Sequence, residues 1–171
     1  MIKKKICMLG AFAVGKTSLV QRYVNSIFSE KYQTTIGVKI DQRKVEVNGR
    51  EVNMILWDIH GEDEFQKIKS SYLMGASGYF IVIDGTRKNT LEVGKKIQEM
   101  ASDATQNAPW IALINKSDLK KEWELTQSEI KQLSENGWHI IETSAKEDYR
   151  VEEAFDEIAR KMLGQQGKNP A

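Results

Sequence analysis

The stretch KKICMLGAFAVGKTSLVQRYVN, residues 4–25, decides the fold because an apolar run, a glycine-bounded loop and an amphipathic segment follow one another directly. Residues 4–10, with the apolar run ICML, predict a β-strand that ends in glycine, and the spacing of apolar residues over 16–25 predicts a helix. The loop between them, GAFAVGKTS, matches GxxxxGK[ST] at a strand-to-helix junction. We therefore expect a phosphate-binding loop that opens an α/β domain.

This loop has the residue types that a phosphate chain requires. Gly10 and Gly15 allow the backbone to wrap closely, so that successive N–H groups point at phosphate oxygens beside a helix N-terminus. Lys16 supplies a positive charge for the outer phosphates, and the Thr17 hydroxyl suits Mg²⁺. The alternative is a glycine turn that only caps a helix. The predicted phosphate-binding residues here are Ala13, Val14, Gly15, Lys16, Thr17 and Ser18.

The rest of the chain alternates short apolar runs with longer amphipathic segments, an order typical of α/β proteins. Asn48-Gly49 suits a two-residue turn between antiparallel strands at 38–47 and 51–57. Continuous apolar runs, typical of buried parallel strands, occupy residues 79–84, 110–115 and 138–143. Further helices are expected near residues 90–102, 126–136 and 151–163. We predict a six-stranded, mostly parallel sheet with one antiparallel strand and five flanking helices.

Length and composition narrow the class of protein. The 171 residues suffice for one domain, expected over residues 1–164, with a flexible tail or truncated linker at 165–171. A net charge of +1 gives no reason to expect nucleic acid as a partner. The single cysteine, Cys7, lies in an apolar run and is expected to be a buried structural thiol. No disulfide framework and no bilayer-spanning apolar stretch exist, so a cytoplasmic protein is predicted.

Residues 115–118, NKSD, follow an apolar run and are expected at the ligand-binding edge of the sheet. The Asp118 carboxylate can accept hydrogen bonds from the N1–H and exocyclic amine of guanine, an edge that adenine does not present. Asn115 and the stem of Lys116 can pack around the ring and the loop. By itself, NKSD also fits an ordinary surface turn.

The sequence TSAK, residues 143–146, repeats this placement after the next predicted strand. There the backbone N–H groups of Ala145 and Lys146 can meet the guanine O6. Together the two motifs favour guanine over adenine and argue against an ATPase or kinase, for which the sequence also lacks a lid or acceptor site.

Five motifs in order resemble those of the Ras superfamily of small GTPases over residues 4–163: GAFAVGKT, TTIG (34–37), WDIHG (57–61), NKSD and TSAK. Within that superfamily, TIGV (35–38) and SSYLMGA (70–76) are most similar to the Rab branch, and DGTR (84–87) resembles prokaryotic Rab-like G domains. The resemblance implies a P-loop NTPase G domain. It also implies a Mg²⁺-dependent switch that binds GTP and hydrolyses it to GDP.

The resemblance also assigns roles to individual residues. Thr35 would bind Mg²⁺ and the γ-phosphate, and Tyr32 could cover the phosphates. Asp58 would hold Mg²⁺ through water, and the Gly61 N–H would reach the γ-phosphate. The metal set is then Thr17, Thr35 and Asp58. The guanine set is Phe28, Asn115, Lys116, Asp118, Ser144, Ala145 and Lys146, with a hydrophobic anchor as the alternative role of Phe28.

Three residues depart from the family pattern near the expected transfer centre. Glu62 stands where the family usually has glutamine; an ionised carboxylate can accept from water but cannot donate to the transferring group. Glu62 and Lys16 are our candidate catalytic residues, with Glu62 pointing to solvent as the alternative. Phe12 is expected to obstruct an arginine finger. His60 is expected at the surface, with a position that reaches the site as the alternative. We therefore predict slow or unconventional hydrolysis, or alternatively a GTP-binding module with little hydrolysis.

Protein partners are expected at the two switch surfaces, residues 28–41 and 60–76, where an effector or regulator would bind. Asp63 and Glu64 are expected to begin a solvated helix. The chain carries no prenylation cysteine and ends in NPA, so we expect a monomer without a lipid anchor in this chain.

Overall fold

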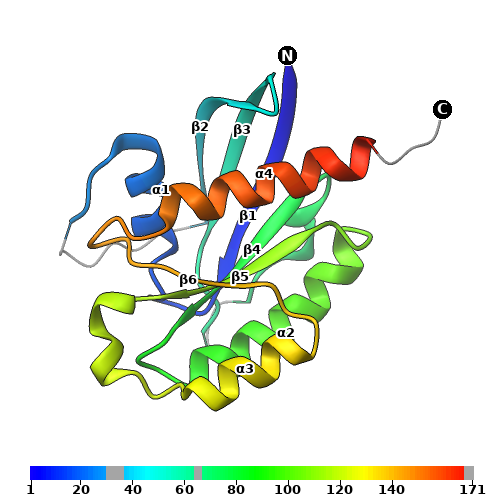
Figure 1. Ribbon diagram of the computed structural model, residues 1–171. Coiled ribbons are helices and arrows are strands. Elements are labelled where there is room, and N and C mark those ends of the chain that lie inside the picture. The colour runs from blue at the N-terminus through cyan, green and yellow to red at the C-terminus, as the bar shows by residue number, and fades with distance from the viewer. Residues whose placement is uncertain (30–36, 64–66, 168–171) are drawn as a thin grey trace.

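The computed structural model describes residues 1–29, 37–63 and 67–167, and within these it has one six-stranded sheet flanked by helices (Figure 1). The strand order is β2-β3-β1-β4-β5-β6, with β2 antiparallel to β3 and the other neighbours parallel. The strands are β1 (Ile2–Gly10), β2 (Val38–Val47), β3 (Arg50–Ile59), β4 (Gly78–Asp84), β5 (Trp110–Asn115) and β6 (Ile140–Glu142). The predicted α/β sheet is thereby confirmed.

The helices follow the predicted order. Among the described residues they are α1 (Lys16–Asn25), α2 (Asn89–Ala104), α3 (Gln127–Glu135) and α4 (Val151–Gly167), with short 3₁₀ helices η1 (Ser70–Leu73) and η2 (Ser117–Glu122). We expected five flanking helices; the described part contains four α-helices and the two short 3₁₀ helices. α4 continues past its predicted end at residue 163, since the exposed Gly164 lowers helix propensity without blocking the helix.

Side-chain alternation along β1 divides the core into two layers. Ile6 and Met8 pack with the residues of α1 and α4, whereas Cys7 and Leu9 pack with those of α2 and α3. Figure 1 shows the two helix pairs on opposite sides of the sheet. Cys7 is fully buried, as predicted, and burial raises the pKa of its thiol to about 12. No helix in the described ranges combines the length and the apolar character needed to cross a membrane.

The antiparallel hairpin at one end of the sheet forms as its turn residues predict. Asn48 has φ of 52° and Gly49 has φ of 74°, the paired positive angles of a two-residue hairpin turn. The turn leads from Val47 to Arg50, which are paired across the two strands. This hairpin brings the end of β3, which carries WDIHG, back to β1.

The parallel register brings the predicted motifs to one edge of the sheet. β1, β3, β4, β5 and β6 run in the same direction, so their carboxyl ends lie together. Met8 is paired with Asp58, and Asp84 with Asn115. Since β1 has β3 on one side and β4 on the other, the strand order reverses beside β1, which is where open α/β sheets bind ligands.

Candidate functional site

The phosphate loop connects β1 to α1 and holds a conformation that few residues adopt. Ala13 has a left-handed backbone with φ of 65°, and Gly15 has φ of 103°. A Cβ atom on Gly15 would lie 2.3 Å from Asn115 Nδ2, so a larger residue would displace that amide. Val14 is buried, and Ser18 is half-buried in the first turn of α1. The neighbouring loops therefore support a backbone that would otherwise be unfavourable.

Two side chains from the end of β5 hold the outer side of this loop. Asn115 Nδ2 donates a hydrogen bond to Val14 O at 3.0 Å, and Lys116 Nζ donates to Ala13 O at 3.4 Å. The C=O and the following N–H of a trans peptide point in opposite directions. Since these bonds hold the carbonyls of Ala13 and Val14 on the outer side of the loop, the N–H groups of Val14 and Gly15 point to its inner side. Successive N–H groups that face one concavity are suited to binding an anion.

Lys16 lies buried against the same loop, with only 6% of the residue exposed. Its Nζ donates to the carbonyls of Ala11 at 3.0 Å and Gly10 at 3.4 Å. Burial lowers the pKa of Lys16 to about 8; the Asp58 carboxylate opposes this shift, and the Arg87 guanidinium adds to it. A phosphate beside Nζ would stabilise the ammonium form, so the site is electrostatically suited to an anion.

The predicted metal residues Thr17 and Asp58 are in contact. Thr17 Oγ1 donates to Asp58 Oδ2 at 2.7 Å, and Asp58 is 1% exposed. A hydroxyl and a carboxylate are the hard oxygen ligands that Mg²⁺ prefers when phosphate completes its shell. No group of three or more His, Cys, Asp or Glu able to hold a metal occurs in the described part of the chain. The donor set thus fits a phosphate-bound Mg²⁺; Thr35 and Tyr32 lie outside the described residues.

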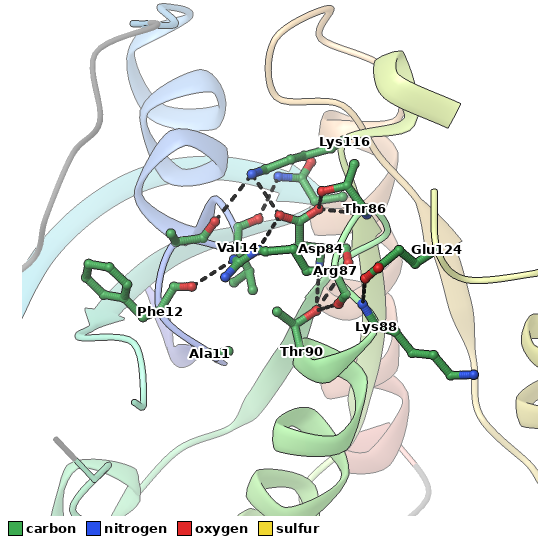
Figure 2. A network of polar contacts seen from close by, with 12 residues as sticks. Ala11, Phe12, Val14, Asp84, Thr86, Arg87, Lys88, Thr90, Lys116 and Glu124 are labelled. Atoms are coloured by element: carbon green, nitrogen blue, oxygen red, sulfur yellow. Dashed lines mark hydrogen bonds and ion pairs between the residues drawn. The ribbon is translucent and has the colours of Figure 1, made fainter. Parts of the chain in front are cut away.

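Asp84, the last residue of β4, joins the phosphate loop to the NKSD loop (Figure 2). Its fully buried carboxylate accepts from Thr86 N at 2.9 Å and Thr86 Oγ1 at 2.7 Å. It also contacts Arg87 Nε at 3.0 Å and Lys116 Nζ at 2.8 Å. Burial raises the pKa of Asp84, but the bonds from Lys116, Thr86 and Arg87 together hold it below its ordinary value. Arg87 Nη2 further donates to Phe12 O at 2.8 Å.

The two predicted guanine motifs meet at the end of the sheet. Ser144 Oγ donates to Asp118 Oδ1 at 2.7 Å. Asn115 Oδ1 accepts from Thr143 Oγ1 at 3.1 Å and from Ala145 N at 3.3 Å. NKSD and TSAK therefore form one loop cluster. The Ala145 N–H, which we expected to meet guanine, is directed at the Asn115 side chain.

Arg22 of α1 holds this loop cluster through two backbone carbonyls. Its Nε donates to Ala145 O and its Nη2 to Lys146 O, both at 2.8 Å. The Lys146 side chain is exposed. Phe28 is half-buried against the core layer of α1 and α4, with the Arg22 guanidinium 6.0 Å from its ring centroid. Phe28 thus lies on the α1 side of the guanine loops and packs against this core layer, and its contact with guanine stays a prediction.

Sequence reasoning missed four residues that hold these loops: Arg22, Thr143, Asp84 and Arg87. Only Asp84 carried a usable signal, because a charged residue that ends an apolar strand takes the same place as Asn115 in the next strand. Thr143 and Arg87 lie within the TSAK and DGTR motifs, but neither motif assigned them these contacts, and Arg22 lies in none of the quoted motifs.

Glu62 is paired with the phosphate loop through its backbone. Glu62 N donates to Gly10 O at 3.1 Å, and Phe12 N donates to Glu62 O at 3.0 Å. Its carboxylate accepts from Ile68 N at 3.3 Å and lies 3.8 Å from Lys67 Nζ. The Glu62 side chain is only 15% exposed, so it does not point freely to solvent, and its carboxylate is bound to Ile68 N.

Gly61 and Phe12 are in close backbone contact beside the same loop. A Cβ atom on Gly61 would lie 2.4 Å from Phe12 Cα, so only glycine allows this approach. Phe12 is 38% exposed, and its ring points away from the Asp84 cluster in Figure 2.

The prediction that His60 lies at the surface is wrong. His60 is 8% exposed, and its ring nitrogens lie 3.3 Å from Gly37 O and 3.3 Å from Lys67 O. Its ring also meets Tyr72 edge-on at 6.3 Å. Gly37, which precedes β2, and Lys67, which follows β3, therefore cover this side chain. The sequence around His60 does not reveal contacts with residues so far away along the chain.

The strained glycine loop before α1 and the polar loops at one edge of a parallel sheet define a phosphate-loop nucleotide-binding α/β protein. A model of the Ras family matches residues 5–164. The Ras-related protein RABA5a of Arabidopsis thaliana is 34% identical over 92% of this chain and 72% of its own length. Human Ras-related protein Rab-12 is 31% identical over 94% and 68%, and Arabidopsis RABA5e is 35% identical over 90% and 72%. The chain therefore belongs to the Ras family, as a Rab-like small GTPase.

Proposed function

We propose that this protein is a monomeric, Mg²⁺-dependent GTP switch that hydrolyses GTP slowly. The observation that carries slow hydrolysis is the position of Glu62, whose carboxylate is held by Ile68 N at 3.3 Å and lies near Lys67. A residue that orients the attacking water must be available at the γ-phosphate. In the arrangement described, Glu62 would have to leave Ile68 before it could act.

Nucleotide binding is supported by the joined loops. The Asn115 side chain donates to the phosphate loop at Val14 and accepts from the TSAK loop at Ala145. One amide thus aligns the base-reading loops with the phosphate-binding backbone. With Asp118 held by Ser144, its carboxylate is oriented to read the guanine edge.

The metal proposal rests on Thr17 and Asp58, with Thr35 as the further expected ligand. The short Thr17 to Asp58 contact places a hydroxyl and a carboxylate together next to Lys16. When bound, Mg²⁺ would neutralise charge on the outer phosphates. Lys16 would add a buried positive charge, and the loop N–H groups would orient the phosphate chain.

The second candidate is a GTP-binding module with little or no hydrolysis. It is favoured by the same Glu62 geometry, since a carboxylate engaged by Ile68 and Lys67 orients no water. The two candidates share every binding contact and differ only in phosphate release.

We propose that an effector or regulator binds the switch regions, residues 28–41 and 60–76, of which residues 30–36 and 64–66 lie outside the described part of the chain. Ile40 is 49% exposed on β2, and Met74 is 70% exposed after η1. Between them, Lys5 Nζ lies 3.6 Å from the Trp57 ring centroid and donates to Met74 O. Exposed apolar side chains next to an organised aromatic residue favour a protein partner.

The test begins with nucleotide-free protein and fluorescent GDP and GTP, with unlabelled GTP and ATP as competitors, in Mg²⁺ and in EDTA. GTP should displace the probe at least 100-fold better than ATP, because the adenine edge leaves Asp118 unpaired. Equal competition by ATP would refute the guanine assignment. Phosphate release is then followed in a single turnover: a slow but complete release supports the enzyme, and none over many hours supports the binding module.

A further inference from the structure

Arg87 lies in the loop between β4 and α2 and reaches across to the phosphate loop (Figure 2). Its Nη2 donates to Phe12 O at 2.8 Å, a contact between residues 75 positions apart in the sequence. Its Nε is held at 3.0 Å by Asp84 Oδ2. One guanidinium therefore bridges a buried carboxylate and a single carbonyl of the phosphate loop.

This contact has a defined effect on the next peptide. The Phe12 C=O and the Ala13 N–H belong to one planar trans peptide and point in opposite directions. By drawing the Phe12 carbonyl outward, Arg87 turns the Ala13 N–H toward the inner side of the loop. Lys116 does the same to the next peptide through Ala13 O, and Asn115 to the one after it through Val14 O.

The peptide that joins Phe12 to Ala13 precedes a residue with an unfavourable backbone conformation. Ala13 has φ of 65°, a conformation that L-residues other than glycine adopt at a cost. The preceding peptide is held separately, because the Phe12 N–H donates to Glu62 O of a different segment. By holding the Phe12 carbonyl, Arg87 opposes a rotation of this peptide that would relieve the Ala13 conformation.

Asp84 makes Arg87 a rigid support. The carboxylate is fully buried and is fixed by Thr86 as well as by Lys116, so it holds the guanidinium in one orientation. The planar guanidinium places Nε on Asp84 and Nη2 on Phe12 from one rigid group, whereas a lysine at position 87 would have to make both contacts from a single Nζ.

We propose that Arg87 is a positioning residue that preorganises the phosphate loop for the phosphate chain of a guanine nucleotide by orienting the Ala13 N–H. This inference rests on the proposed function. Arg87 acts through the Phe12 peptide and does not touch the nucleotide, because its contact lies on the carbonyl side of the loop.

The experiment compares the wild type with Arg87→Ala, Arg87→Lys and the control Lys88→Ala. The Lys88→Ala substitution removes the same charge from the same loop. Lys88 Nζ pairs with Glu129 at 3.0 Å and not with the phosphate loop, so this variant leaves the phosphate loop untouched. Two quantities are measured: the dissociation constant and off-rate of fluorescent GDP, and hydrogen exchange of the Ala13 amide in nucleotide-free protein. Thermal unfolding of each variant is recorded alongside.

Loss of a charge-assisted hydrogen bond should weaken GDP about tenfold in Arg87→Ala, mostly through the off-rate, and accelerate exchange at Ala13. The preference for GTP over ATP should not change, because the base-reading loops keep Asn115 and Asp118. Arg87→Lys should recover only part of the affinity, and Lys88→Ala should behave as the wild type.

Complete rescue by Arg87→Lys would overturn positioning and leave only a long-range charge effect. GDP binding and Ala13 exchange in Arg87→Ala equal to those of Lys88→Ala would overturn the inference while leaving the proposed function intact. A wild-type protein that binds no GDP would overturn both. If Arg87→Ala fails to fold, GDP binding and Ala13 exchange are compared between Arg87→Lys and Lys88→Ala. Equal values in these two variants would overturn the inference.

Discussion

Thr17 Oγ1 lies 2.7 Å from Asp58 Oδ2, which joins the start of α1 to the end of β3 across 41 positions of sequence. The contact means that the two proposed Mg²⁺ residues are brought together by the fold itself. An ion would then bind to a pair that is already assembled, so little further ordering is required.

Removal of the Asp58 carboxylate should therefore uncouple nucleotide binding from Mg²⁺. We expect Asp58→Ala to lose most of the affinity gain that Mg²⁺ gives wild-type protein, about tenfold or more, because the carboxylate that would hold Mg²⁺ through water is gone, together with its charge. Titration of fluorescent GDP in Mg²⁺ and in EDTA measures this ratio. Asp103→Ala, at an exposed site near the end of α2, is the matched control. An unchanged ratio in Asp58→Ala would exclude the metal role.

Glu62→Gln should increase the single-turnover rate of GTP hydrolysis about tenfold. Glutamine can both accept from water and donate to the transferring group, and it removes the charge that pairs with Lys67 at 3.8 Å. Phosphate release after addition of Mg²⁺ gives the rate. A slower Glu62→Gln variant would instead indicate that the carboxylate acts as a base.

Phe12→Gly should make hydrolysis responsive to an external guanidinium group. The ring is 38% exposed and is expected to obstruct an incoming arginine finger. Millimolar guanidinium ion can stand in for such a finger in the phosphate-release assay. We expect stimulation of Phe12→Gly, and no stimulation of the wild type or of Phe12→Leu, which keeps a bulky side chain. Equal stimulation of all three would show that Phe12 obstructs nothing.

Asp118→Ala should reduce the preference for GTP over ATP by about 100-fold, because the guanine N1–H and amine lose their acceptor. Competition against fluorescent GTP gives the preference directly. Ser144→Ala should have a smaller effect in the same direction, since it removes only the hydroxyl that holds Asp118 at 2.7 Å. A full preference in Asp118→Ala would place base recognition elsewhere.

Asp84→Asn should destabilise the protein in a pH-dependent way. The lowered folded-state pKa of Asp84 means that its charge stabilises the fold above the ordinary value of 3.8, and that this contribution declines as pH falls toward the folded-state pKa. We expect a loss of about 2 kcal/mol in the free energy of unfolding at pH 7, measured by urea unfolding. The difference from wild type should begin to narrow below pH 3.8. A difference that stays constant to pH 3 would contradict the assignment.

Much of the fold could be predicted because its signals are local. Asn48 and Gly49 specify a turn through their own backbone preferences. The unbroken apolar run from Ile6 to Leu9 specifies two buried faces, because successive side chains of a strand point to opposite sides. The short 3₁₀ helices could not be predicted in this way, since a single turn such as η1 has no periodicity to detect. The expected surface position of His60 was wrong, because its cover comes from Gly37 and Lys67 on other segments.

By itself, the sequence determined the order of strands, helices and glycine loops, and with it the positions of the phosphate loop, NKSD and TSAK. These follow from hydrophobic periodicity and from residue-specific backbone preferences, which act over a few neighbouring residues. Only the tertiary structure decided that Asp84 aligns Arg87 and Lys116 against the phosphate loop, and that Glu62 is held by Ile68. Such contacts depend on how loops from different strands pack, and distance along the chain does not encode that packing.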